Sequence, residues 1–300
     1  MKIIKNIINQ INKYDLIFSI IETIIFYTGN IIFYNHKFNI IIFLLLYLLI
    51  LVSLLIIKNI YLKLRKYSIK SKKTFTKKQI LIMMIPIILI HLICYIGYFP
   101  GTFSYDINAV NNMVTSKLVW SNVNPVIYTI LWGICYKIEL LLNISNFRII
   151  LYTIIQLSFI LFTYYYLFKW LIKNNYNKLI IIIIYIYLLI NPILHLMSIT
   201  TSKDVIVSYL FLLFIITFIN LNNNYNKKNM ILLFILGLLC LLFTNNFLPL
   251  MIIILIILFF YERKLSLVVL NSILIYSFIL ILLPIFNIRY TQHMKLYQSQ

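Results

Sequence analysis

The chain has 300 residues, of which 63% are hydrophobic, and its mean hydropathy is +0.99. A soluble domain contains only about 45–50% apolar residues, so this composition excludes a soluble enzyme or a soluble binding module. The formal charge of +20 does not indicate nucleic-acid binding, because Lys and Arg gather in short loops between apolar runs, as they do in the cytoplasmic loops of membrane proteins.

Long runs of Ile and Leu without strand-like alternation predict membrane helices, since only helices and closed barrels satisfy their backbone groups in lipid. We therefore expect an all-α, polytopic transmembrane bundle of about nine or ten hydrophobic segments. The cysteines Cys94, Cys135 and Cys240 lie singly in apolar runs, with no Cys or His at metal-ligand spacing. This pattern indicates buried thiols and neither a disulfide framework nor a zinc site.

The N-terminal part, residues 1–79, is predicted to contain two spans and a basic loop. The spans extend from Leu16 to about Tyr34 and from about Phe38 to Ile57. The stretch from Lys58 to Lys78 then carries nine Lys and Arg residues and no acid. Such a stretch predicts a cytoplasmic loop beside anionic lipid headgroups, and it orients the rest of the chain.

A third span, Ile80 to Phe99, leads outward into a polar loop that begins with Pro100-Gly101. This loop contains Asp106, one of only six acidic residues in the chain. A carboxylate near a membrane boundary usually faces a cavity, a partner or a substrate. The simpler alternative is that Asp106 caps a helix or forms a turn after Pro-Gly.

Three apolar segments follow, at about Val126–Leu142, Ile149–Trp170 and Leu179–Leu194. If Asp106 and Asp204 share a face, an even number of crossings must separate them. One of the three segments must then be re-entrant or lie on the surface, and the first, which carries Lys137 and Glu139, is the best candidate. Alternatively, these two charges lie near the cytoplasmic end of an ordinary span.

The last third of the chain is predicted to contain four more spans. Lys227 and Lys228 follow the span Val205–Asn220 and mark a cytoplasmic loop, which places Asp204 outside. The run Met230–Phe260 is about twice too long for one span, and Asn245-Asn246 divide it into two short helices whose junction faces outward.

The membrane core is expected to end shortly before the C-terminus. Glu262, Arg263 and Lys264 mark the cytoplasmic side once more, and a last span from Leu265 to about Ile285 completes a core of residues 80–286. The polar tail, residues 287–300, is then expected outside the membrane.

Several polar groups converge on the outer face in this topology. They are Asp106, the Asn124-Pro125 turn, Lys203-Asp204 and Asn245-Asn246. His195 follows Asn191-Pro192 and approaches the same face. Each has a structural alternative: Asp204 is typical of a helix N-terminus, Lys203 of a snorkelling side chain, and the Asn pair of a polar tip.

In their order and spacing these motifs resemble those of the GT-C superfamily of membrane glycosyltransferases, most closely its uncharacterised bacterial multi-span members. The resemblance covers about Ile80 to Phe260. It implies a GT-C-like core in the bacterial cytoplasmic membrane. It also implies transfer of a sugar from a polyprenyl-phosphate carrier to an acceptor on the extracytoplasmic face, with inversion.

The residues suit that chemistry. A carboxylate in a partly dry cavity is a suitable general base, which favours Asp106. The leaving phosphate needs a cation, for which Lys203 is a candidate. Asp204 either orients Lys203 or holds a divalent ion together with Asp106. Asn124, Asn245, Asn246 and His195 complete the expected substrate-binding set.

Two departures from the family pattern leave other functions open. Relatives commonly have His-Pro where this chain has Asn124-Pro125, and Arg-Asn-Asn where it has Thr244-Asn245-Asn246, so a candidate phosphate contact is missing. The chain also stops at Gln300, so we expect a truncated form, a partner subunit or a degenerate copy. The alternatives are a carrier or flippase for a lipid-linked precursor and a non-catalytic scaffold.

Overall fold

The computed structural model describes residues 12–34, 39–68, 77–115, 125–223, 225–261 and 263–282. Within these ranges the chain is helical and has no β-strand, only an isolated parallel bridge between Thr102 and Thr200. The all-α prediction is therefore confirmed for this part of the chain. Two compact units are present, one of Met1–Thr74 with Asn177–Ile180 and one of Phe75–Tyr176 with Ile181–Gln300.

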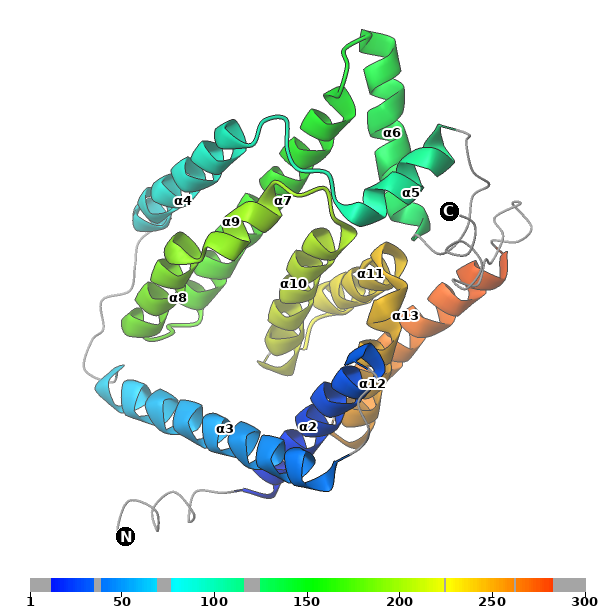
Figure 1. Cartoon of the computed structure of the whole chain (residues 1–300). Helices are drawn as coiled ribbons and strands as arrows, with labels where there is room; N and C mark the ends of the chain where they lie inside the picture. The colour runs from blue at the N-terminus through cyan, green and yellow to red at the C-terminus, as the bar shows by residue number, and fades with distance from the viewer. Residues whose placement is uncertain are drawn as a thin grey trace. The chain divides into compact units, whose positions relative to one another are not determined.

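The smaller unit contains a helical hairpin of α2 (Lys13–Tyr34) and α3 (Ile40–Ser68) (Figure 1). At the turn, the Tyr27 hydroxyl accepts a hydrogen bond from the backbone N–H of Asn39 at 2.6 Å. At the open end, the Asp15 carboxylate accepts a hydrogen bond from Lys58 Nζ at 2.5 Å. Polar contacts at both ends therefore hold the two antiparallel helices together.

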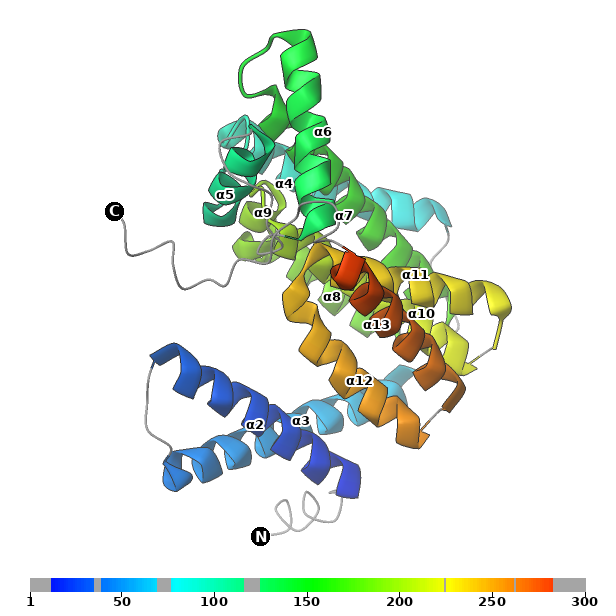
Figure 2. The same cartoon turned by 90° about the vertical axis from the view of Figure 1, so that its right-hand side faces the viewer.

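The larger unit contains the other helices, apart from the first turn of α8 (Figures 1 and 2). In chain order they are α4 (Lys77–Gly97), α5 (Tyr105–Val114), α6 (Val126–Leu142), α7 (Phe147–Lys173), α8 (Lys178–Ile190), α9 (Pro192–Ser198), α10 (Lys203–Asn223), α11 (Lys227–Phe243), the 3-10 turn η1 (Asn245–Phe247), α12 (Leu248–Tyr261) and α13 (Arg263–Leu282).

Four of the described helices, α4, α7, α10 and α13, are long and apolar enough to cross a membrane. The pair α8–α9, bent by 61°, makes a fifth candidate span. These helices and the composition are those of a membrane protein. These are fewer than the expected nine or ten segments. Helices α6 and α11 have only 17 residues each and α12 has 14, fewer than the about 20 that a straight span needs. The two expected N-terminal spans are not among the candidates either: α2 is absent from them, and α3 contributes only the short apolar stretch Ile40–Ile56.

Two predicted helix breaks are confirmed. Asn191 ends α8, and its side chain accepts a hydrogen bond from the backbone N–H of Ile193, which caps α9. Pro192 at the first position of α9 lacks an N–H, so the chain bends there. Asn245 begins η1 between α11 and α12, which divides the long apolar run as expected.

Cationic residues at helix ends gather at one end of this unit, which we call the basic end. Near it, Trp170 Nε1 donates a hydrogen bond to Asn220 Oδ1 at 2.7 Å, joining α7 to α10. The Lys264 ammonium lies 5.3 Å from the ring centroid of Tyr225 and joins the start of α13 to that of α11. The cations are Lys78, Lys169, Lys173, Lys227, Lys228, Arg263 and Lys264.

The opposite end, where α4 ends and α7 and α10 begin, we call the loop end. Helices α5 and α6 stay there, and in both views α6 and the α6–α7 turn extend beyond the other helices of the larger unit (Figures 1 and 2). Of the helices between α5 and α10 in the chain, α7 and the bent α8–α9 pair are candidate spans, whereas α6 has 17 residues and is not among them. That Val126–Leu142 does not cross back stays a prediction.

Helix α10 is the centre of the core. Its residues Val207, Leu210 and Phe214 belong to a cluster with α5, α6 and α11–α13, whereas Tyr209 and Ile216 face a second cluster with α4, α7 and α8. A helix that is apolar on all sides is expected to be buried in this way. Of the cysteines, Cys135 and Cys240 are buried as predicted, and Cys94 is half-buried.

Candidate functional site

Two loops at the loop end are joined by hydrogen bonds: residues 98–104, which precede α5, and residues 199–202, which precede α10. The backbone N–H of Thr102 donates to the carbonyl of Ile199 at 3.0 Å, and the N–H of Thr201 donates to the carbonyl of Thr102 at 3.0 Å. The hydroxyls of Thr102 and Thr200 lie 2.9 Å apart. We call these two segments the paired loops.

Gly101 is required for this pairing. Its φ of 125° lies in a region that residues with a side chain rarely adopt. A Cβ at this position would lie 2.6 Å from Thr153 Cγ2 and 3.1 Å from the carbonyl oxygen of Ile199. The Pro100-Gly101 motif therefore allows the first loop to pass closely between α7 and the second loop.

Further hydrogen bonds tie both loops to the helices around them. Ser104 Oγ donates to the carbonyl of Thr201, so its side chain does not cap α5. The Tyr128 hydroxyl of α6 donates to the same carbonyl at 3.0 Å, and the Tyr152 hydroxyl of α7 donates to the carbonyl of Ser202 at 3.3 Å. These contacts fix where α5 and α10 begin.

The paired loops bring two of the predicted carboxylate positions together. Asp106 is the second residue of α5 and Asp204 the second residue of α10, and each helix starts within one or two residues of the Ser104–Thr201 contact. The side chain of Asp204 is exposed, whereas that of Asp106 lies outside the described residues. Helix N-termini carry partial positive charge, which favours anions at this end.

Lys203 is only 8% exposed. Lysine is rarely buried unless its charge is compensated. Its burial at the first position of α10 places a cation directly beside Asp204 in the chain. The structure therefore differs from the snorkelling alternative, in which the ammonium group stays exposed.

A polar cluster that local sequence patterns did not predict braces α5. The Asn111 side-chain oxygen accepts hydrogen bonds from Arg148 Nη1 at 2.9 Å and from Trp132 Nε1 at 3.3 Å. Arg148 also donates its backbone N–H to Glu139 Oε2 at 2.8 Å, and its guanidinium lies 5.2 Å from the ring centroid of Tyr136. The cluster links α5, α6 and α7 beside the paired loops.

His195 occupies a buried position and does not share the exposed surface of Asp204. It is 5% exposed, and its ring lies 4.7 Å from that of His91 on α4. His195 Nε2 bonds to the carbonyl of Leu189, and His91 Nδ1 bonds to Ser198 Oγ, both at 3.0 Å. Because these partners accept, we infer that each of the two nitrogens carries the hydrogen.

Gln156 of α7 is a second feature missed by sequence reasoning. It is fully buried, and its amide nitrogen donates to the carbonyls of Met197, Ser198 and Thr200, at 3.2, 3.0 and 2.9 Å. The two amide hydrogens are therefore shared among three carbonyls. Those of Met197 and Thr200 also accept the backbone N–H of Thr200 and Ser202, so the Ser198 carbonyl at the end of α9 depends most on Gln156. A Gln within an apolar run is the signal that marks this position.

The predicted Asn residues differ in their surroundings. Asn245 begins η1, and its side-chain oxygen accepts a hydrogen bond from the Tyr276 hydroxyl at 2.7 Å, while Asn246 is exposed. Helix α11 runs antiparallel to α10, so η1 belongs to the loop end. Asn124 lies outside the described residues, although Pro125 directly after it is buried at the start of α6.

Among the residues that the structure describes, no group of three or more His, Cys, Asp or Glu side chains is arranged to hold a metal ion. The side chain of Asp106, which belongs to the expected Asp106–Asp204 pair, lies outside the described residues. No family model, curated protein or solved structure matches the chain.

Proposed function

We propose that the chain is a GT-C-type membrane glycosyltransferase of the bacterial cytoplasmic membrane. It transfers a sugar from a polyprenyl-phosphate donor to an acceptor at the loop end, which faces away from the cytoplasm. The side of the membrane follows from the cations at the basic end, because Lys and Arg are retained on the cytoplasmic side.

The observation that carries the proposal is the pairing of the loops around Thr102 and Thr200. It gathers Asp106, Lys203 and Asp204 at the starts of two neighbouring helices, although 98 residues separate the joined segments. One membrane boundary then has carboxylates that can act as acid or base, a cation, and the positive ends of two helices. This combination suits a substrate that has both a hydroxyl and a phosphate.

In the proposed reaction the acceptor oxygen attacks the anomeric carbon of the donor. Its hydroxyl proton passes to the Asp106 carboxylate, and the bond from the anomeric carbon to the phosphate oxygen breaks with inversion. Polyprenyl phosphate leaves with the bonding electrons, and Lys203 offsets the negative charge that develops on it. Asp204 orients Lys203. Alternatively, Asp106 and Asp204 would hold a divalent cation, which would offset charge on the leaving phosphate.

The braced helix α5 supports the role given to Asp106. A general base must be held within hydrogen-bond distance of the proton that it accepts. Helix α5 is held at its start by the Ser104–Thr201 contact and further along by Asn111, which binds Arg148 and Trp132. Asn246, which is exposed at η1, is the better placed of the two Asn residues to contact sugar or phosphate.

The decisive experiment compares lipid-linked sugars and surface glycans in cells that carry the wild-type protein or Asp106→Asn at equal membrane abundance. A polyprenyl-phosphate sugar should accumulate in the mutant, and one glycan decoration should be lost. Asn108→Ala, an exposed change on the same helix, is the matched control and should leave both unchanged. If the Asp106→Asn cells kept all their surface glycans, the proposed transferase activity of Asp106 would be contradicted. Sugar transfer is also measured in membranes with and without a chelator of divalent ions, and a loss of transfer with the chelator would indicate that the reaction needs a metal ion.

A carrier for a lipid-linked precursor is the second candidate, and one observation favours it. The α8–α9 span is broken at Asn191, and beside it the buried His91, His195 and Gln156 place polar groups inside the bundle. Discontinuous helices with polar groups at mid-membrane depth are typical of transporters. The test uses proteoliposomes that contain a labelled polyprenyl-phosphate sugar. A carrier would move this lipid from one leaflet to the other without consuming it, whereas a transferase would consume it only when the acceptor is present.

A further inference from the structure

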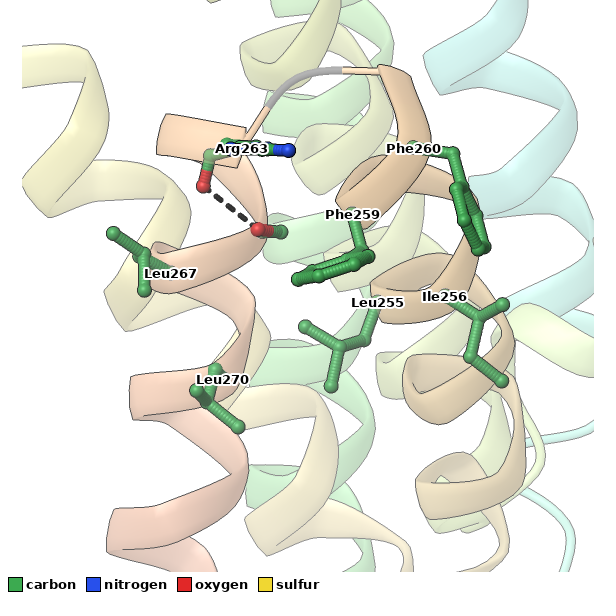
Figure 3. A pocket seen from close by; sticks show the side chains of 8 residues that line it. Leu255, Ile256, Phe259, Phe260, Arg263, Leu267 and Leu270 are labelled. Carbon is green, nitrogen blue, oxygen red and sulfur yellow. Dashed lines mark hydrogen bonds between the residues drawn. The ribbon is translucent and has the colours of Figure 1, made fainter.

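An apolar groove lies between α12 and α13 near the basic end of the larger unit. Its volume is about 560 Å³, within the range of about 300–1,000 Å³ typical of ligand pockets. Figure 3 shows Leu255 and Phe259 of α12 and Leu270 of α13 pointing into the space between the two helices. The other lining residues are Ile256, Phe260, Arg263, Ser266 and Leu267.

Arg263 provides the charge at this groove. It is exposed at the first position of α13, and Figure 3 shows its guanidinium at the end of the groove. Its backbone carbonyl accepts a hydrogen bond from Ser266 Oγ at 2.7 Å, so the Ser266 hydroxyl hydrogen is already used. Within the part of the chain that the structure describes, no hydrogen bond or ion pair involves the Arg263 guanidinium.

The neighbouring cation points elsewhere. Lys264 Nζ lies over the ring of Tyr225, in the connection between α10 and α11. The groove therefore has a cation at its mouth that is separate from the Lys264 contact. Glu262, between α12 and α13, lies outside the described residues.

The position of the groove in the bundle indicates which class of ligand it binds. It lies at the basic end, where the described part of the larger unit has seven cations at helix ends. On the cytoplasmic side of a membrane, anionic phospholipids produce a negative surface potential, and basic pockets between membrane helices bind their headgroups. A long apolar lining with one guanidinium at its mouth matches an acyl chain that ends in a phosphate.

We propose that this groove binds an anionic phospholipid of the cytoplasmic leaflet, with one acyl chain between α12 and α13 and the phosphate on Arg263. The site is separate from the proposed transferase site, which lies at the loop end. A second apolar groove of about 220 Å³, between α10 and α12, is lined by Phe211, Phe214, Ile215, Phe218, Ile254, Ile257 and Leu258. It has no cation in its lining, so it offers no charged contact that would favour an anionic headgroup.

The experiment measures lipid retention on the full chain by native mass spectrometry. The protein is released from vesicles that contain equal amounts of phosphatidylglycerol and phosphatidylethanolamine. The wild type should retain phosphatidylglycerol preferentially, and Arg263→Gln should weaken that retention about fivefold, since one cation near a lipid headgroup contributes about that factor. Lys264→Gln removes the same charge one residue away and should leave the preference unchanged.

A second pair of variants tests the apolar part of the site. Leu270→Trp fills the groove and should abolish the bound lipid, whereas Leu274→Trp, an exposed position on α13 outside the groove, should not. Excess inorganic phosphate should fail to displace the lipid, which distinguishes a lipid site from a free-phosphate site. Each of three results overturns the proposal: equal retention of both lipids by the wild type, equal losses in Arg263→Gln and Lys264→Gln, or full retention in Leu270→Trp. A cross-link that places α2 or α3 in the groove overturns it as well.

Discussion

The hydroxyls of Thr102 and Thr200 lie 2.9 Å apart, although 98 positions separate the two residues in the chain. The contact belongs to the paired loops that precede α5 and α10. Everything proposed for the loop end depends on this pairing, because it sets where Asp106, Lys203 and Asp204 lie relative to one another.

Replacement of Gly101 should separate the paired loops. Gly101→Ala places a Cβ 2.6 Å from Thr153 Cγ2 at a φ of 125°, so we expect a loss of stability of about 1–3 kcal/mol. Thermal unfolding of the purified protein in detergent measures it. Gly97→Ala is the control, since a Cβ there meets nothing within 4 Å. If both variants unfold at the same temperature, Gly101 does not hold the loops in the way described.

Removal of the Gln156 amide should destabilise the end of α9. Gln156→Leu keeps the size of the side chain but withdraws the donor from the carbonyls of Met197, Ser198 and Thr200. A buried group left without a partner costs about 1–3 kcal/mol. We expect about 2 kcal/mol in total, mainly from the Ser198 carbonyl, because the carbonyls of Met197 and Thr200 keep the backbone N–H groups of Thr200 and Ser202 as donors. Ser158→Ala, an exposed change on the same helix, serves as the comparison and should alter stability by less than about 0.5 kcal/mol.

Loss of the Asn111 side chain should affect both stability and the proposed activity. Asn111→Ala leaves the buried Trp132 indole N–H and one Arg148 nitrogen without an acceptor, which should cost about 2 kcal/mol. Sugar transfer should decrease further than the loss of folded protein explains, because α5 carries Asp106. The measurements are unfolding and transfer at equal amounts of folded protein. Unchanged transfer would show that the cluster has a structural role only.

The smaller unit should lose stability in acid. The hydrogen bond from Lys58 and that from the backbone N–H of Asn12 lower the pKa of Asp15 below its ordinary value of 3.8. A lowered pKa contributes stability that is fully present above the ordinary value and is lost as the pH falls through the folded-state pKa. Because the pair is partly exposed, its contribution should not exceed about 1 kcal/mol.

Carbon-13 NMR titration of the Asp15 carboxyl group provides the test of this shift. The titration midpoint should lie below 3.8 in the wild type and return toward that value in Lys58→Gln. An unchanged midpoint in the Lys58 variant would mean that another group causes the shift.

Local hydropathy and helix breakers predicted the all-α class and the bounds of several helices, but they overestimated how many helices are long enough to span a membrane. The segment Val126–Leu142 has the observed bounds of α6, because Pro125 precedes it and Asn143 adopts a left-handed conformation directly after it. The breaks at Asn191 and Asn245 were also recognised, since Asn and Pro within apolar runs interrupt helices.

What the sequence could not predict depends on long-range contacts. Helix α5 lies within what was expected to be a loop, although Ile107, Val110 and Met113, which are buried, have the i, i+3 spacing of an amphipathic helix. The Thr102–Thr200 pairing joins distant segments, and no local pattern marks it. The burial of His195 likewise follows from its contact with His91 on another helix.

The paired loops can form only late in the synthesis of the chain, because 98 positions separate Thr102 from Thr200. The segment around Thr102 is synthesised early, but its partner at Thr200 leaves the ribosome only after the segments that become α7 and the α8–α9 span. The loop end therefore stays incomplete until both spans have been inserted, and a nascent chain that stops before Thr200 exposes the unpaired first loop to proteases and chaperones.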